Sequence, residues 1–597
     1  MDTRSKGGKQ IGKKAPGTEI DEKTTITVSQ AIKDLRILSE TCPICNLKVT
    51  EYDDGLLCER CHSWHHRTCS KISKTEYKEL SNSVDEYVCP RCLTKTSNDS
   101  DAVVEEAKEC CFPDHENVSD PSRLKLGSWN SWEVLTQCEG IYGVIVKWRR
   151  NIFLLPSGAA GKAFIEEMTK VANNFTAGSA MESVTMTLLM IMPSLLLQKP
   201  SKRSKAKEHT EVLKRRLVLW QAGKLEELLR EGQEIQRRMG KGKHKHGHVE
   251  RVFTRLMMKG KVSAAMRWIG ENATGILEPT PDVIKVLKEK HPKASPASKG
   301  SCLSGPARRV EPVIFDSIDG ESIRQAAKRV QGAAGPSGMD ADAWKRLLCS
   351  KQFGKKCEDL CNAIAGIARK LCVRNLDPTM LTSLTACRLV PLDKKPGVRP
   401  VGIGEVLRRI IGKTVMTLLQ KDLVGATAPI QVCAGLQGGV EAAVHAARDC
   451  FEDPETEAII LVDAENAFNL LNREAAINNM YIVCPEVATY IMNTYRMPAR
   501  LFIAGEDENL FSEEGTTQGD PPAMGFYACG TIPLIDAGNI ERKVTQIWYA
   551  DDSAAGGKLE EMRKWWDNLC IKGPLFGYNP KSSKTWVIVK PEHEEKA

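Results

Sequence analysis

The chain has 597 residues, of which 42% are hydrophobic and 27% charged, a composition that fits soluble globular protein along most of its length. This length is too great for one hydrophobic core and predicts about three or four folded units. The net charge of +8 is modest, but the basic residues are unevenly distributed along the chain.

The chain contains 21 cysteines, which raises the question of disulfides. Residues 1–14 read MDTRSKGGKQIGKK and lack the apolar core of a secretory signal. We therefore expect an intracellular protein, nuclear or cytoplasmic and not secreted, whose cysteines are thiols or metal ligands. The most apolar run, 184–197, is shorter than the roughly 20 residues of a bilayer span and contains Pro193. It predicts a buried helix and no membrane partner.

Composition divides the chain into six segments. We expect a polar, disordered segment at 1–40, a cysteine-rich finger at 41–94, an acidic linker at 95–125, a helical, basic region at 126–289, a second linker at 290–312, and alternating helices and strands at 313–597.

The finger contains eight residues of the zinc-ligand type. Their spacing is C-x-x-C, a gap of twelve, C-x-x-C, four residues, H-x-x-C, a gap of nineteen and C-x-x-C. A two-residue gap lets both sulfurs of a pair reach one tetrahedral zinc, so eight ligands form two sites. About 50 residues with so little apolar content need such metal cross-links to fold. A chance cluster of free thiols is the alternative.

This order of four Cys, one His and three Cys resembles a PHD finger. The resemblance implies two structural Zn²⁺ ions in interleaved sites, one bound by Cys42, Cys45, His66 and Cys69 and the other by Cys58, Cys61, Cys89 and Cys92. PHD fingers commonly bind histone tails, often with methyl-lysine held against aromatic faces. The resemblance places Trp64 at a cage position, and Tyr52 could form a second wall. The alternative is that Trp64 only packs the finger.

Basic residues are concentrated in three runs of the middle region, at 199–207, 214–216 and 237–248. Such charge binds phosphate backbones through counterion release. We expect contact with RNA or DNA without base specificity. A solvated helix face is the alternative.

Three aspartates have the pattern of a two-metal site. Nucleotidyl transfer uses two divalent metals about 3.5–4 Å apart, and Mg²⁺ prefers carboxylate oxygens. The apolar run 458–462 predicts a strand that ends at Asp463, and 544–549 predicts another that leads into Asp551 and Asp552 at a turn. If the two strands are neighbours in one sheet, these carboxylates converge.

Five motifs in order resemble the reverse transcriptases of non-LTR (LINE-like) retrotransposons. They are LVPLDKKPGVRPVGIGEVLRRIIGK (389–413), DAENAFN (463–469), GTTQGDPPAM (515–524), YADD (549–552) and GYNPKSSKTW (577–586). The resemblance covers roughly residues 310–597. It implies an RNA-directed DNA polymerase whose partners are an RNA template, a DNA primer and deoxynucleoside triphosphates.

The fold class that follows is multidomain. It comprises a small zinc-stapled PHD-type finger, a mostly α-helical basic middle region, and α/β (α+β) reverse transcriptase fingers and palm. In the palm we expect an antiparallel sheet that bears the aspartates and is backed by helices.

The same resemblance implies roles for individual residues. Asp463 and Asp551 bind two catalytic Mg²⁺ ions, Asp552 supports them, and Lys584 is the general acid to pyrophosphate. Phe468 packs under the sugar, Gln518 and Gly519 touch the template base and nucleotide, and Arg399 with Lys394 or Lys395 clamps the triphosphate. Phe468 as core and the basic residues as surface charge are the alternatives.

No helical thumb is predicted in the thirteen residues after Lys584, and no endonuclease, integrase or RNase H motif is evident. Two functions therefore stay open. One is an active polymerase with a finger that recognises chromatin or protein. The other is a histone-tail- or protein-binding zinc finger attached to an inactive or truncated polymerase remnant.

Overall fold

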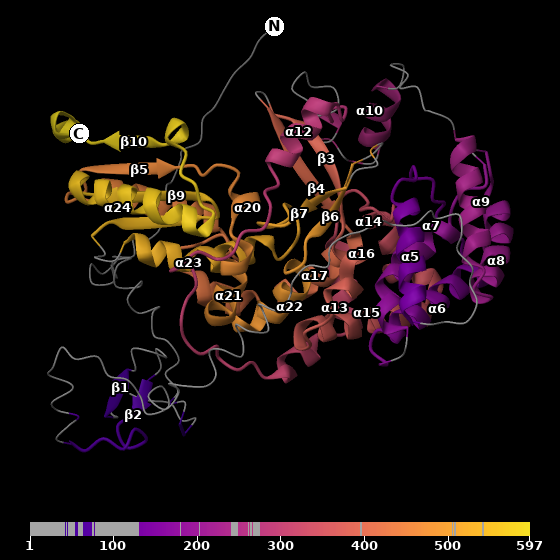
Figure 1. The fold of residues 1–597 in the computed structure, drawn as a ribbon, viewed down its shortest axis with the longest axis horizontal. Helices are drawn as coiled ribbons and strands as arrows, with labels where there is room; N and C mark the ends of the chain where they lie inside the picture. The colour runs from indigo at the N-terminus through magenta and orange to yellow at the C-terminus, as the bar shows by residue number, and fades with distance from the viewer. Residues whose placement is uncertain are drawn as a thin grey trace, which may run out of the picture. The chain divides into compact units, whose positions relative to one another are not determined.

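A computed structural model describes residues 42, 44–45, 54–57, 64–74, 77, 131–178, 181–201, 203–239, 249–258, 260, 262, 265–266, 275–394, 397–503, 506, 509–539 and 543–597. The chain forms two compact units, Met1–Cys111 and Phe112–Ala597. Figure 1 labels most of their helices and strands.

The first unit contains a small antiparallel hairpin. Its strands β1 (Gly55–Leu57) and β2 (Trp64–His66) pair with Gly55 opposite His66. Arg67 follows the hairpin and binds back to the start of β1: its backbone N–H donates to the Asp54 carbonyl at 2.7 Å, and its Nε lies 2.9 Å from the Asp54 carboxylate. The carboxylate of Asp54 is therefore engaged within the finger.

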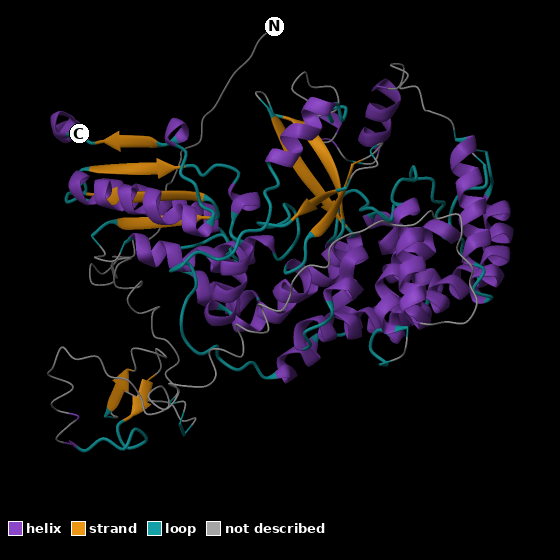
Figure 2. Cartoon of the chain, in the orientation of Figure 1, coloured by secondary structure: helices purple, strands orange, loops and turns teal. Residues whose placement is uncertain are grey.

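The second unit is mostly helical, with two four-stranded sheets (Figure 2). Its N-terminal helices are α5 (Ser131–Ile145), α6 (Ala159–Asn174), α7 (Thr185–Leu196), α8 (Ala206–Gln221), α9 (Leu225–Arg238), α10 (Val249–Met258) and α12 (Pro281–Glu289). The buried helix predicted at 184–197 is confirmed, since every residue of α7 is buried. Within the described residues, the structure holds no helix long and apolar enough to cross a bilayer.

Four further helices lead to the first sheet: α13 (Gly320–Arg329), α14 (Ala341–Cys349), α15 (Lys355–Val373) and α16 (Thr382–Thr385). The turn before α14 ends in a side-chain cap, in which Asp340 Oδ1 accepts from the Ala343 N–H at 2.9 Å. This satisfies one of the free N–H groups at the helix start.

The first sheet has the order β4-β3-β6-β7. Its strands are β3 (Cys387–Asp393), β4 (Val398–Gly404), β6 (Ala499–Ile503) and β7 (Leu510–Ser512). The chain between β4 and β6 includes α17 (Val406–Leu418), α18 (Gln420–Thr427), α19 (Gly439–Glu452), α20 (Ala467–Leu470), α21 (Arg473–Val483) and α22 (Pro485–Tyr495).

The second sheet is antiparallel throughout, with the order β10-β5-β9-β8. Its strands are β5 (Ala458–Val462), β8 (Thr545–Tyr549), β9 (Asp552–Gly557) and β10 (Trp586–Val589). Helices α23 (Ala523–Gly538) and α24 (Leu559–Lys572) flank the β8–β9 hairpin in the chain, and α24 contacts β5 and β9. The strand predicted at 458–462 is thus confirmed.

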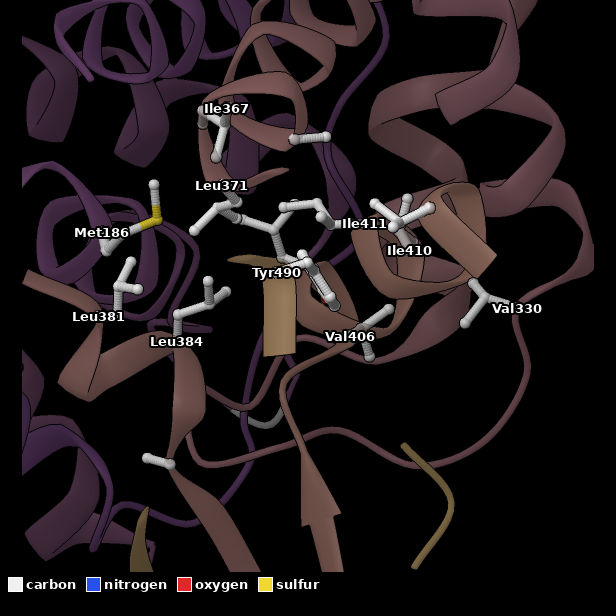
Figure 3. Packing of buried hydrophobic residues seen from close by; sticks show 14 of the residues in the cluster. Met186, Val330, Ile367, Leu371, Leu381, Leu384, Val406, Ile410, Ile411 and Tyr490 are labelled. Atoms are coloured by element: carbon white, nitrogen blue, oxygen red, sulfur yellow. The ribbon is translucent and has the colours of Figure 1, made fainter. Parts of the chain in front are cut away.

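One hydrophobic core joins the N-terminal helices to the rest of the second unit. Figure 3 shows part of it, where Met186 of α7, Leu371 of α15, Leu384 of α16, Ile411 of α17 and Tyr490 of α22 lie together. The division of this unit into a helical region, a linker and a polymerase region remains a prediction from the sequence.

The segment predicted as the second linker, 290–312, makes specific hydrogen bonds. The Ser295 N–H donates to Glu514 Oε1 at 2.7 Å, and Asn472 Nδ2 donates to the Ser295 carbonyl at 2.9 Å. Asn479 Nδ2 donates to the Ser301 carbonyl at 2.8 Å, and its Oδ1 accepts from the Leu303 N–H at 2.7 Å. Hydrogen bonds therefore hold this segment against the start and the middle of α21.

Acidic partners offset much of the basic charge on α8 and α9. Glu231 lies 2.7 Å from Arg215 and 2.8 Å from the buried Arg216, and Glu234 lies 2.9 Å from both Arg237 and Arg238. Residues 240–248, which hold most of the third basic run, lie outside the described residues. Nucleic-acid contact by this region remains a prediction.

Glu405, at the start of α17, is a fully buried carboxyl group. Ser337 donates to it twice, from its backbone N–H at 2.6 Å and from its hydroxyl at 2.7 Å. Burial raises the pKa of Glu405 to about 7, because these hydrogen bonds and the nearby Arg409 and Arg388 only partly compensate for lost hydration.

The Glu405→Gln variant should remove a pH dependence of stability. Since the folded pKa lies above the ordinary value, the stabilisation is fully present below about pH 4.5 and is lost as the pH rises through about 7. Between pH 5 and 8 we expect the wild-type free energy of unfolding to fall by about 2–3 kcal/mol relative to the variant. Urea denaturation at several pH values measures this, and parallel pH profiles for the two proteins would contradict it.

Candidate functional site

Four residues of the first unit form a metal-ligand cluster. Their ligand atoms lie within 4.8 Å of one another and belong to Cys42, Cys45, His66 and Cys69. His66 Nδ1 is 3.3 Å from Cys45 Sγ and 3.9 Å from Cys69 Sγ. Tetrahedral zinc with sulfur and nitrogen ligands needs separations of about 3.5–3.8 Å. The cluster is therefore a zinc-binding site with the ligand set predicted for the first zinc.

The thiols of this cluster differ in their acidity. Burial raises the pKa of Cys42, but backbone hydrogen bonds from His66, Cys45 and Ile44 outweigh it and lower the value to about 6. Burial, then the neighbouring Cys45 and Cys42, raise the pKa of Cys69 to about 11. Crowded thiols cannot all lose their protons, because the resulting thiolates repel one another. A bound Zn²⁺ would remove this repulsion and stabilise the thiolates.

The remaining residues predicted for the finger lie outside the described part of the chain. These are the second set of zinc ligands, Cys58, Cys61, Cys89 and Cys92, and the proposed cage residue Tyr52. Trp64 lies in β2 opposite Leu57, and its side chain is not described.

The three aspartates lie at one end of the second sheet. Asp463 directly follows β5, and Asp552 is the first residue of β9, the strand that neighbours β5. The pairing of Val462 with Ser553 brings these two ends together, and Asp551 lies in the turn just before β9. The strands predicted at 458–462 and 544–549 are not neighbours, because β9 lies between β5 and β8. The aspartates converge because β9, the second strand of the hairpin, pairs with β5.

Electrostatic coupling follows from this proximity. Burial, with smaller contributions from the negative charges of Asp552 and Asp463, raises the pKa of Asp551 to about 6 against the opposing effects of a backbone hydrogen bond and of Lys584. Burial and Asp463 likewise raise the pKa of Asp552. Carboxylates that repel one another in this way present hard oxygen ligands, and a divalent cation would relieve the repulsion.

Lys584 is bonded to the first of these aspartates: its Nζ donates to Asp463 Oδ2. The loop that carries Lys584 runs beside the segment after β5, since the Lys581 N–H donates to the Asp463 carbonyl at 2.9 Å and the Glu465 N–H to the Asn579 carbonyl at 2.9 Å. Backbone pairing thus holds this lysine beside the carboxylates.

Of the predicted triphosphate-binding residues, Lys394 lies within electrostatic reach of the aspartates. Burial lowers its pKa, as do the charges of Arg399 and Lys584, while Asp463 raises it. Arg399 is exposed on β4 opposite Leu392, and Lys395 lies outside the described residues.

Phe468 is half-buried on α20 and stacks on the buried Tyr527 of α23, with ring centroids 4.7 Å apart. Its backbone carbonyl accepts from the Thr516 N–H at 2.6 Å. Phe468 therefore connects the segment after Asp463 to the loop that contains the predicted nucleotide-contacting residues.

Gln518 and Gly519 are exposed and line a cavity of about 180 Å³ with β4 residues and with Arg408 and Arg409 of α17. The next residue, Asp520, is buried and fixes the loop: its carboxylate lies 2.6 Å from Arg408 Nη2 and accepts from the Tyr495 hydroxyl at 2.7 Å. Gln518 and Gly519 therefore lie beside β4 of the first sheet.

Tyr578 is a buried residue that sequence reasoning did not assign to the site. Its hydroxyl donates to the Asp551 carbonyl at 3.0 Å and lies 3.1 Å from Ser553 Oγ. Tyr578 belongs to the motif at 577–586, a segment already assigned to the palm. The sequence signal that could have identified it is a polar aromatic residue two positions before Pro580.

Comparison with known protein families identifies the finger. Residues 38–110 match the PHD-type zinc finger of Pygopus. No curated protein matches the chain. The chain is therefore a multidomain protein with an N-terminal PHD-type zinc finger, a class of module that suggests chromatin or protein recognition, joined to a mostly helical body with small sheets.

Proposed function

We propose that the Phe112–Ala597 unit is an RNA-directed DNA polymerase of the retrotransposon reverse transcriptase kind, and that the PHD finger directs it to chromatin in the nucleus. The observation that carries this proposal is the meeting of Asp463, Asp551 and Asp552 at one end of an antiparallel sheet. Core packing gives no reason for three partly exposed carboxylates to share one sheet end, where burial and the charge of Asp463 raise the pKa of Asp551 and of Asp552.

The residues at this sheet end fit a pair of Mg²⁺ ions. Asp463 and Asp551 would hold them, with Asp552 in support, and the ions would supply activation of the primer 3′-hydroxyl and neutralisation of the triphosphate. The donor set consists of carboxylate oxygens, which Mg²⁺ prefers.

The other residues then have roles around the nucleotide. Lys394 and Arg399 bind the triphosphate, and Lys584, already bonded to Asp463, donates a proton to the leaving pyrophosphate. Phe468 packs under the sugar, held by its stacking on Tyr527. Gln518 and Gly519 contact the template base and incoming nucleotide, with the buried Asp520 fixing their loop.

Primer extension tests the proposal. The full chain is incubated with oligo(dT) annealed to poly(rA), Mg²⁺ and dTTP, and the extended DNA is resolved on a gel. Extension that depends on the RNA template supports the proposal, and its absence at all enzyme concentrations refutes it.

A second candidate function is favoured by the match of the finger to a known family. Here the chain is a histone-tail- or protein-binding module, and the larger unit is an inactive polymerase remnant. Titration with methylated and unmodified histone-tail peptides, for wild type and Trp64→Ala, tests the binding. Weaker binding by the variant would place Trp64 in the cage, and unchanged affinity would limit it to packing.

A further inference from the structure

The turn that carries two of the aspartates has an unusual backbone. Ala550 lies between Tyr549, the last residue of β8, and Asp551, and it has a φ of +56°. Tyr549 pairs with Asp552, so Ala550 is the first residue of a two-residue hairpin turn. Glycine is the ordinary residue where such a turn needs a positive φ, and alanine there is strained. Something in the surrounding structure must hold this conformation.

The side chain of Gln431 holds it. Gln431 Oε1 accepts from the Ala550 N–H at 2.8 Å, and Gln431 Nε2 donates to the Ala550 carbonyl at 3.1 Å. One amide thus satisfies both backbone groups of the strained residue. Gln431 is fully buried and Ala550 nearly so, so water does not compete for these bonds.

The backbone around Gln431 is itself fixed against the hairpin. The Val432 N–H donates to the Trp548 carbonyl at 2.9 Å, and the Trp548 N–H donates to the Ile430 carbonyl at 2.8 Å. Residues 430–432 therefore extend the sheet beside β8 as a short parallel bridge. The amide reaches the turn from a rigid base, while Tyr578 holds the Asp551 carbonyl.

We propose that Gln431 is a positioning residue for the metal-binding carboxylates, an inference that rests on the proposed function. Its amide fixes the backbone conformation of Ala550. That conformation determines the positions of the Cα atoms of Asp551 and Asp552, from which their side chains extend. Two-metal chemistry depends on carboxylate positions to within a fraction of an ångström. A structural role alone would affect stability but leave the metal affinity unchanged.

The test compares two glutamine-to-methionine changes in the full chain. Gln431→Met keeps nearly the shape of the side chain and removes both bonds to the turn. Gln546→Met is the matched control in β8: the amide of Gln546 bonds Ile535 and the indoles of Trp548 and Trp565. Both variants lose side-chain hydrogen bonds at the same hairpin, fully buried ones for Gln431 and partly buried ones for Gln546, but only Gln431→Met releases the turn.

Two readouts separate positioning from stability. Mn²⁺ binding, followed by electron paramagnetic resonance without nucleotide, should weaken about tenfold or more in Gln431→Met, and the kcat of primer extension should fall about tenfold to a hundredfold, with KM for dTTP little changed. Gln546→Met should lower the melting temperature while keeping both values near wild type. Equal Mn²⁺ affinity and equal kcat in the two variants would overturn the proposal.

A second-site change gives an independent check. Ala550→Gly removes the strain of the positive φ, so in the Gln431→Met background it should restore part of the Mn²⁺ affinity, because glycine adopts the turn conformation without help from the amide. Mn²⁺ affinity that stays as low as in Gln431→Met alone would overturn the positioning role. Wild-type protein that binds Mn²⁺ without extending primers would refute the polymerase function. The positioning role of Gln431 would then be supported by weaker Mn²⁺ binding in Gln431→Met than in the wild type. Protein that binds no Mn²⁺ would refute both.

Discussion

The Asp551→Asn variant should lose primer extension by about a thousandfold or more. Asparagine keeps the shape of the side chain but removes the charge that would bind a catalytic metal, and each 1.36 kcal/mol of lost transition-state stabilisation lowers the rate tenfold. The variant should also be slightly more stable than wild type at pH 8, because burial and neighbouring carboxylates disfavour the charged form of Asp551.

Two measurements check this prediction, a primer-extension time course and thermal unfolding. Asp567→Asn is the matched control, since Asp567 is a partly exposed aspartate of α24 that pairs with Arg563 at 3.0 Å. It should keep wild-type extension. Residual activity above a few per cent in Asp551→Asn would contradict the assigned role.

Loss of the zinc site should unfold the finger. A structural zinc contributes an apparent free energy of about 10–16 kcal/mol in small fingers, and a segment with so little apolar content has no core to replace it. Cys42→Ser removes the buried ligand of the zinc cluster, whose other ligands are Cys45, His66 and Cys69. We expect this variant, or chelation of the wild type, to make the finger sensitive to limited proteolysis.

Metal analysis provides the second readout for the finger. The wild type should contain two zinc ions per chain and Cys42→Ser fewer. Cys302→Ser is the control, because Cys302 is exposed and lies in the second unit. A Cys42→Ser protein that keeps its full zinc content and its protease resistance would exclude this residue as a ligand.

The local elements were largely predictable, because their signals lie within a few adjacent residues. The apolar run 458–462 predicted β5, and the run 544–549 predicted β8. The buried helix α7 followed from a run too short to span a bilayer and interrupted by Pro193. Each of these depends on a pattern of apolar residues within one short segment.

Long-range contacts were not predictable from composition. The segment 290–312 has the composition of a linker, yet Ser295 binds Glu514, 219 residues later in the chain. Gln431 and Ala550 are 119 residues apart, and no spacing rule connects an isolated glutamine to a turn in another motif. A single sequence records which groups can form hydrogen bonds but not which of them the fold brings together.

The candidate sites divide in the same way. The spacing predicted two zinc sites, and the resemblance to a PHD finger implied that Cys42, Cys45, His66 and Cys69 share the first of them, which the structure confirms. The convergence of Asp463 with Asp551 was predicted on the condition that the strands 458–462 and 544–549 be neighbours, whereas the structure achieves it through β9, which lies between β5 and β8. The catalytic roles of these aspartates stay a prediction.

The most direct test of the metal site is anomalous diffraction from crystals of the full chain soaked in Mn²⁺ and dTTP. We predict two anomalous peaks about 3.5–4 Å apart, from Mn²⁺ ions bound by the carboxylates of Asp463 and Asp551. Crystals that show well-ordered nucleotide and no Mn²⁺ at these side chains would contradict it.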